Sequence, residues 1–324
     1  YTNLNTLSLH DALPIYKNIL MGDYGWYKEK VGEALATKRA LAKNFSRNAD
    51  TLYVHADTLR LFSYDLRTDS AYRVLHGYFH VRAYRTDVQA VCDSLVFHSK
   101  LRKLSLYRDP IAWSDDRQIL GEEINVYTND STLDSVYVER QALIVQQLPD
   151  TVHFNQVSGN MLQAYFAKGQ LYQARVNGNA MVINFPIEKD SSLLYQNYCE
   201  AAKMRIDIVD RKMRRYWAGP SPIAKTYPIN MAPAEHTKFS NFAWFSRIRP
   251  QGPHDLFEWR AKSDENKLKI LPRRAAPMQT LDKNKATGAS QWEKKIEVPL
   301  ETPTSPPTQT SVNDSLPSNS SNTH

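Results

Sequence analysis

The chain has 324 residues, of which 42% are hydrophobic, 23% charged and 11% aromatic, and its formal net charge is +7. This hydrophobic fraction is enough for a folded body with its own core. No stretch approaches the roughly 18 consecutive apolar residues that a membrane-spanning helix requires, which excludes such a helix from this sequence. The only cysteines are Cys92 and Cys199, at non-equivalent positions in the chain, and we expect two separate buried thiols.

The first residues of the chain are expected to differ in origin from the rest. Residues 6–15 resemble the conceptual translation of a sequencing adapter, so we expect residues 1–15 to be non-native and the native chain to begin near Tyr16. The lack of a signal peptide in the sequence therefore gives no information about where the protein is located.

Residues 22–27 form a degenerate first copy of a repeated sequence unit. Residues 31–43 carry a short helical periodicity, although alignment of the repeat assigns the same stretch to a strand.

A repeated unit accounts for most of the chain. Residues 119–146 align without a gap on residues 157–184, at a shift of 38, which places Gly121 on Gly159 and Val138 on Val176. Further copies align at shifts of 32 and 29, and about six units fit between residues 22 and 224. Identity is sparse while the apolar pattern is shared, which indicates a stack of similar structural units. We expect one elongated domain over residues 16–230.

Each unit is predicted to contain two short strands. Apolar and polar residues alternate, as in Leu59, Arg60 and Leu61, which is typical of a strand with one buried face. In the second strand of a unit, the alternation is predicted to resume one residue out of phase after a bulge or corner, which keeps the apolar side inward. The predicted corners lie at Gly77, Arg108-Asp109, Arg140-Gln141 and Gly178-Asn179.

These strands predict a continuous apolar inner wall. Because each buried methylene group contributes about 0.8 kcal/mol, such a wall, if open to solvent, forms a groove for alkyl chains. An ordinary closed core is the alternative for every one of its members. The predicted wall consists of Leu59, Leu61, Phe79, Val81, Leu95, Phe97, Ile111, Trp113, Ile124, Val126, Leu143, Val145, Leu162, Ala164, Phe166, Met181 and Ile183.

Two regions follow the repeat. Residues 231–260 favour a C-terminal cap that closes the open end of the stack, with a partner-docking segment as the alternative. Residues 261–324 are rich in Pro, Ser, Thr and Lys and offer little to offset the entropy of ordering, so we expect a disordered tail. The aromatic residues of the first region are Phe239, Phe242, Trp244, Phe245, Phe257 and Trp259.

No constellation of catalytic or metal-binding residues stands out, so we expect neither an enzyme, a cofactor nor a metal site. The acidic position at Asp57, Asp93 and Glu122 becomes Asn160 and Ala202 in later units, which fits turn chemistry better than acid–base catalysis. The histidines lack the spacing of zinc ligands. Basic residues cluster over residues 203–215, where a solvated strand face is the simplest interpretation, and we expect no nucleic-acid binding.

Four segments together carry a family resemblance: residues 56–59 (ADTL), 92–95 (CDSL), 121–127 (GEEINVY) and 176–180 (VNGNA). They resemble the OstA-like, organic-solvent-tolerance family of periplasmic lipopolysaccharide-transport proteins, which includes LptA, LptC and the N-terminal domain of LptD. The resemblance covers residues 16–227. The length and the Pro/Ser/Thr-rich tail are similar to the long forms found in Bacteroidetes-type bacteria.

The resemblance implies an all-β fold, an elongated open β-jellyroll of stacked strands. It implies a protein of the periplasm or cell envelope that binds lipopolysaccharide, with the lipid A acyl chains in the apolar interior. Its partners would be other jellyrolls, joined end to end into a bridge between the inner and outer membranes, and self-association through edge strands would fit the same picture. The length of this chain leaves open whether it is a bridge component or an accessory protein.

Two other classes of protein remain possible from the sequence. A structural or adhesive β-solenoid of the cell envelope would have a filled, closed interior and bind no lipid. A carbohydrate-active repeat enzyme would need paired carboxylates on an exposed face, and the substitutions along the acidic series argue against it.

Overall fold

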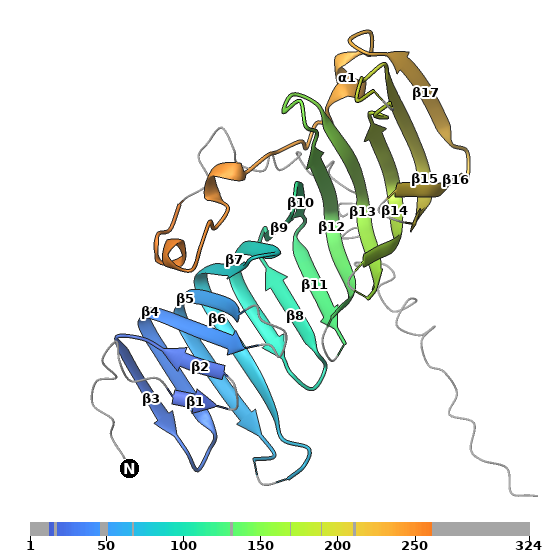
Figure 1. Cartoon of the computed structure of the whole chain (residues 1–324). Helices are drawn as coiled ribbons and strands as arrows, with labels where there is room; N and C mark the ends of the chain where they lie inside the picture. The colour runs from blue at the N-terminus through green and yellow to red at the C-terminus, as the bar shows by residue number, and fades with distance from the viewer. Residues whose placement is uncertain are drawn as a thin grey trace, which may run out of the picture. The chain divides into compact units, whose positions relative to one another are not determined.

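The computed structural model describes residues 13–15, 18–45, 51–66, 68–129, 132–168, 170–188, 190–209 and 212–260, and this part of the chain is nearly all β (Figure 1). The expectations for residues 1–12 and for the tail at 261–324 lie outside the described residues. The strands are β1 (Leu13–Ile15), β2 (Asn18–Met21), β3 (Tyr24–Lys28), β4 (Glu33–Phe45), β5 (Thr51–Tyr64), β6 (Tyr72–Arg85), β7 (Val88–His98), β8 (Lys103–Tyr107), β9 (Ile111–Ser114), β10 (Arg117–Leu120), β11 (Glu123–Thr128), β12 (Leu133–Gln147), β13 (Phe154–Ala167), β14 (Gln170–Asn184), β15 (Tyr195–Val209), β16 (Lys212–Gly219) and β17 (Ile223–Pro228).

The helical elements in the described part are short. They are α1 (Ala234–Thr237) and two 3₁₀ turns at Ser246–Ile248 and His254–Phe257. Most of the stretch with helical periodicity, residues 31–43, lies in β4, so the assignment from the repeat alignment is confirmed. The strands follow one another antiparallel in chain order, as expected for stacked two-strand units.

Each long strand bends and so contributes to two half-sheets. In β12, residues 133–139 pair with β11 and residues 143–146 pair with β10. We call the half-sheet that contains β3, β8, β11 and β16 the first half-sheet, and the one that contains β2, β9, β10 and β17 the second half-sheet. Where a loop interrupts a long strand, two short strands take its place, one in each half-sheet.

The corners between the half-sheets have a recurring backbone conformation. Two consecutive residues adopt positive φ angles, at Lys38-Arg39, Phe79-His80, Arg108-Asp109, Arg140-Gln141 and Gly178-Asn179. Three of the predicted corners are therefore confirmed, whereas the corner in β6 lies at Phe79-His80 and not at Gly77. At the corners of β4, β6, β12 and β14, the two residues with positive φ oppose a single residue of the next long strand, which is a β-bulge.

The corner geometry overturns the predicted phase of the second strand. In β12, Val138 is buried on the inner side, and Ala142 and Ile144 follow on that same side, because the two corner residues preserve the alternation. The one-residue slip occurs instead in the neighbouring strand β13, where Gly159 is followed by Leu162 on the inner side. The prediction therefore places the apolar residues beyond the corner on the wrong face in β9, β12 and β14, whereas Val81, beyond the corner of β6, does lie on the inner side.

The aligned glycines mark a close approach that recurs in two units. A Cβ atom on Gly121 would lie 2.3 Å from Cγ1 of Val138, and one on Gly159 would lie 2.4 Å from Cγ1 of Val176. Real carbon atoms do not approach this closely. A Cβ atom at this position beside the corner would force a neighbour to shift in both units, which explains why glycine recurs at the shift of 38.

Candidate functional site

The two half-sheets share one apolar cluster, which we call the inner face. Residues of both half-sheets pack into this cluster along the whole series of strands from β2 to β15. In the first half-sheet it includes Leu59, Leu61, Leu95, Phe97, Ile124, Val126, Leu162, Ala164 and Phe166. In the second half-sheet it includes Ala42, Val54, Ala90, Ala112, Ile119, Ile144, Val157 and Val182.

Burial on the inner face decreases with distance from the corner. Leu59, Ile124 and Leu162, next to the corner, are at most 1% exposed. Val126 and Phe166 lie farther along the same strands and are only half-buried. Apolar side chains that remain partly accessible can contact an alkyl chain without unfolding the core. The inner face therefore offers apolar surface toward the free ends of the strands.

The second half-sheet contributes a matching row of apolar residues. Ile119, Ile144, Val157 and Val182 occupy successive partner positions across β10, β12, β13 and β14, and all four are half-buried. Sequence reasoning missed this row because it took the opposite phase beyond the corner. The signal was present in the alignment, since Ala142 and Ala180, which lie on the same side as these residues, fall on one another at the shift of 38.

The prediction of a single continuous wall is wrong for part of its members. Phe79 is 53% exposed because it lies in a corner, with a φ angle of 60°. Ten residues do share the inner face: Leu59, Leu61, Val81, Leu95, Phe97, Ile124, Val126, Leu162, Ala164 and Phe166. Six belong to a second cluster on the other side of the second half-sheet: Ile111, Trp113, Leu143, Val145, Met181 and Ile183.

The second cluster is covered by the chain's own C-terminal segment, residues 234–260, which we call the strap. Phe239, Ala243, Phe245 and Ile248 of the strap are buried against Trp113 and its neighbours. The strap runs back along the stack, against the order of the units (Figure 1). From one end to the other, the contacts join His236 to Tyr198, Phe239 to Gln156, Phe245 to Gln118, Arg249 to Gln89, Asp255 to Arg82 and Phe257 to His55.

The sequence predicts that this segment caps the open end of the stack. In the structure the strap does not cap that end. It lies on the outer side of the second half-sheet, so both sides of that half-sheet are apolar and buried or half-buried. This arrangement is the physical reason why the alternation beyond the corners is ambiguous: consecutive apolar residues such as Leu143 and Ile144 contact the strap side and the inner face in turn.

Buried glutamines fasten the strap. Gln89, Gln118, Gln156 and Gln196 are at most 3% exposed. Gln118 and Gln156 each hydrogen-bond the strap backbone twice, Gln196 donates to the carbonyl of His236, and Gln89 accepts from Nε of Arg249 at 2.8 Å. The first three glutamines are separated by 29 and 38 residues, the shifts of the repeat, so three successive units supply the same side chain.

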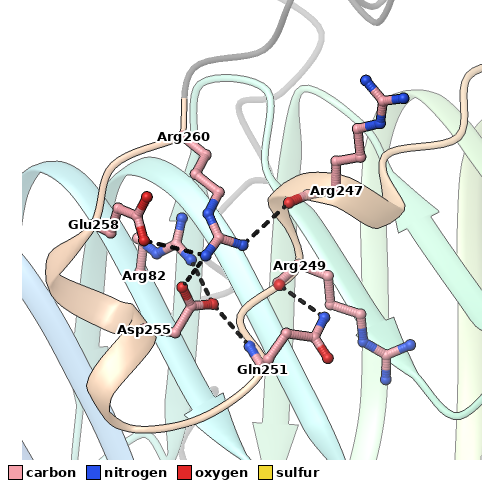
Figure 2. Close-up of polar contacts among 7 residues, drawn as sticks. All are labelled: Arg82, Arg247, Arg249, Gln251, Asp255, Glu258 and Arg260. Atoms are coloured by element: carbon pink, nitrogen blue, oxygen red, sulfur yellow. Dashed lines mark hydrogen bonds and ion pairs between the residues drawn. The ribbon is translucent and has the colours of Figure 1, made fainter.

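An ion-pair cluster holds the far end of the strap (Figure 2). Arg82 is completely buried, and its Nη2 lies 3.2 Å from a carboxylate oxygen of Asp255. Asp255 also accepts hydrogen bonds from Arg260 and from the backbone N–H of Gln251. Burial lowers the pKa of Arg82, while the carboxylate of Asp255 raises it. Asp255 thus compensates a cation that the strap removes from water.

The remaining candidate residues lie in separate parts of the fold. Asp57 contacts His80 at 2.7 Å, an exposed pair at the corner of β6. Cys92 and Cys199 are both buried and form no disulfide, as expected. In the described part of the chain, His, Cys, Asp and Glu do not gather in groups of three that suit a metal ion. Nor does any helix there have the length and apolarity to cross a membrane.

Comparison with known proteins gives a distant structural similarity. No family model matches the chain, and no curated protein matches it in sequence. Among solved structures, the chain is similar to the crystal structure of LptH from Pseudomonas aeruginosa, described as the LptA-homologous periplasmic component of the lipopolysaccharide transport device. The TM-score is 0.33 at 16% sequence identity, and the match covers 43% of this chain and 93% of that chain.

Proposed function

We propose that this chain binds the acyl chains of lipopolysaccharide on its inner face and acts in lipopolysaccharide transport in the periplasm. The observation that carries the proposal is the half-buried apolar surface on the facing sides of both half-sheets, repeated in successive units. Contacts of this kind are not directional, so a lipid is held without being fixed at one position. The OstA-like sequence motifs support the same function.

The ends of the stack support assembly with other jellyrolls. Among the described strands, β3 pairs only with β4 at one end, and β16 pairs only with β15 at the other. Each has an edge of unpaired backbone groups on which another strand can add. End-to-end addition of such units would continue the inner face from one molecule to the next, as a bridge between membranes requires.

Photocrosslinking in cells tests the lipid proposal. A photoreactive phenylalanine at Phe97 or Phe166, both half-buried on the inner face, is expected to give lipopolysaccharide adducts. Tyr137 and Tyr165 provide matched controls, because they are also half-buried aromatic residues but contact each other away from the inner face, with ring centroids 6.2 Å apart.

The result separates the proposed transport function from the alternative of a structural envelope protein. Adducts at the inner positions and none at the tyrosines would support lipid binding. Equal labelling of the two pairs, or no adducts at either inner position in a protein that is normally folded, would favour the structural alternative.

A further inference from the structure

The strap is held by side chains that bind its backbone. Gln156 accepts a hydrogen bond from N–H of Phe239 and donates one to the carbonyl of Thr237, both at 3.0 Å. Gln118 accepts from N–H of Phe245 at 2.8 Å and donates to the carbonyl of Ala243 at 2.9 Å. In both cases one amide bridges the carbonyl of one residue and the N–H two residues later, the pattern that a strand backbone makes in a parallel β pair.

This arrangement defines a binding site for a peptide segment. The amides recognise main-chain groups, which every peptide has, while selectivity comes from the cavities filled by Phe239 and Phe245, six residues apart and both buried. In sheets that bind peptides, main-chain hydrogen bonds likewise provide affinity, and pockets for side chains provide specificity. The site therefore suits a segment with two phenylalanines at this spacing and a turn between them.

The strap is held to the half-sheet that it covers by side-chain contacts and not by strand pairing. None of its described residues belongs to a strand. It is joined to β17 by residues 229–233, in which Met231 is 74% exposed. If the strap came from a second copy of the chain, it would make the same contacts. The free energies of the two arrangements would then differ only through the linker and the entropy of association.

We propose that the strap of one copy docks on the outer side of the second half-sheet of another copy, in exchange for that copy's own strap. The tether gives the internal strap an effective concentration in the millimolar range, so the closed monomer dominates in dilute solution. Exchange becomes populated when copies are held at comparable local concentration, as in an assembly. The proposal does not depend on lipid binding.

Disulfide trapping with the full-length chain tests the exchange. Oγ of Ser158 in β13 lies 3.4 Å from Nδ2 of Asn241 in the strap, and Ser158 is 5% exposed, so a thiol at 158 is reachable from another chain only after its own strap has left. Chains with Ser158→Cys are mixed with chains with Asn241→Cys at increasing concentration and then oxidised. We expect a covalent heterodimer whose yield rises with concentration.

Two controls make the outcome decisive. Replacing Asn241→Cys by Ser246→Cys places the thiol on an exposed strap residue outside this contact and measures random collision. A single chain with both Ser158→Cys and Asn241→Cys should close an internal disulfide when dilute, which shows that the substituted strap docks. The proposal is overturned if that internal disulfide fails to form, or if it forms while the mixture gives no more heterodimer than the Ser246→Cys control.

Discussion

Arg82 and Asp255 are 173 residues apart in the sequence, yet Nη2 of Arg82 and Oδ2 of Asp255 lie 3.2 Å apart. The arginine side chain is 0% exposed and the aspartate side chain 12% exposed, so neither charge is well solvated. One consequence is that the strap and β6 are electrostatically dependent on each other, since removal of either partner leaves an isolated charge in a buried position.

We expect Asp255→Asn to lower the free energy of unfolding by about 3 kcal/mol, because breaking a buried ion pair leaves Arg82 uncompensated. Glu258→Gln is the matched control, since Glu258 contacts Arg260 as well but its side chain is 69% exposed. Its effect should stay within about 0.5 kcal/mol. Urea denaturation measures both variants, and equal effects would contradict the importance of the buried pair.

The side-chain amide of Gln118 is predicted to make a large contribution to the stability of the docked strap. Gln118→Leu leaves the N–H of Phe245, the carbonyl of Ala243 and Nε1 of Trp113 without this buried partner, and each such loss costs about 1–3 kcal/mol. Hydrogen exchange at Phe245 should accelerate along with the loss of global stability. Gln163→Leu, at a half-buried position away from the strap, should leave exchange at Phe245 unchanged.

The close approach at the corners can be tested by a double-mutant cycle. Gly159→Ala should destabilise the chain by about 1–3 kcal/mol, because the new methyl group overlaps Cγ1 of Val176. Adding Val176→Ala removes that overlap, so the double variant should lose less than the sum of the two single losses. Gly252→Ala is the control, since a Cβ there meets no atom within 4 Å. Additive losses would exclude a direct clash.

Stability is predicted to fall below about pH 6.5, the ordinary pKa of histidine. Burial lowers the pKa of His55, and Arg82 and His80 lower it further, against the opposing effects of its hydrogen bond to the carbonyl of Ala40 and of Asp57. The unfolded chain therefore binds a proton at a higher pH than the folded chain does. The contribution of neutral His55 to stability is complete above pH 6.5 and is lost as the pH falls toward the lowered pKa.

The ring of His55 packs on Phe257 with centroids 5.0 Å apart, so this pH dependence should be felt at the end of the strap. Replacing His55→Gln keeps a hydrogen-bond donor near Ala40 but removes the titration. When the free energy of unfolding is measured by denaturation from pH 5 to 8, it should change more steeply with pH in the parent chain than in this variant. Identical slopes would show that His55 does not control the effect.

Much of the fold was predictable because the signals are local. Leu59, Leu61 and their equivalents alternate with polar residues, which predicts strands, and the shift of 38 identifies the stacked units. Residue pairs such as Arg140-Gln141 were identified as corners. The phase of β9, β12 and β14 beyond their corners is opposite to the predicted one, because apolar residues there occupy both sides of the strand.

The sequence by itself determined that the chain is a β repeat protein and where most of its strands turn, since these properties depend on residues close together in the chain. Only the tertiary structure decided which side of the second half-sheet Trp113 and Leu143 occupy, because that depends on a strap more than 90 residues away in sequence. Alternation of apolar and polar residues identifies the buried side of a strand when the other side is exposed to solvent. Here the strap covers the second side, and apolar residues stabilise both.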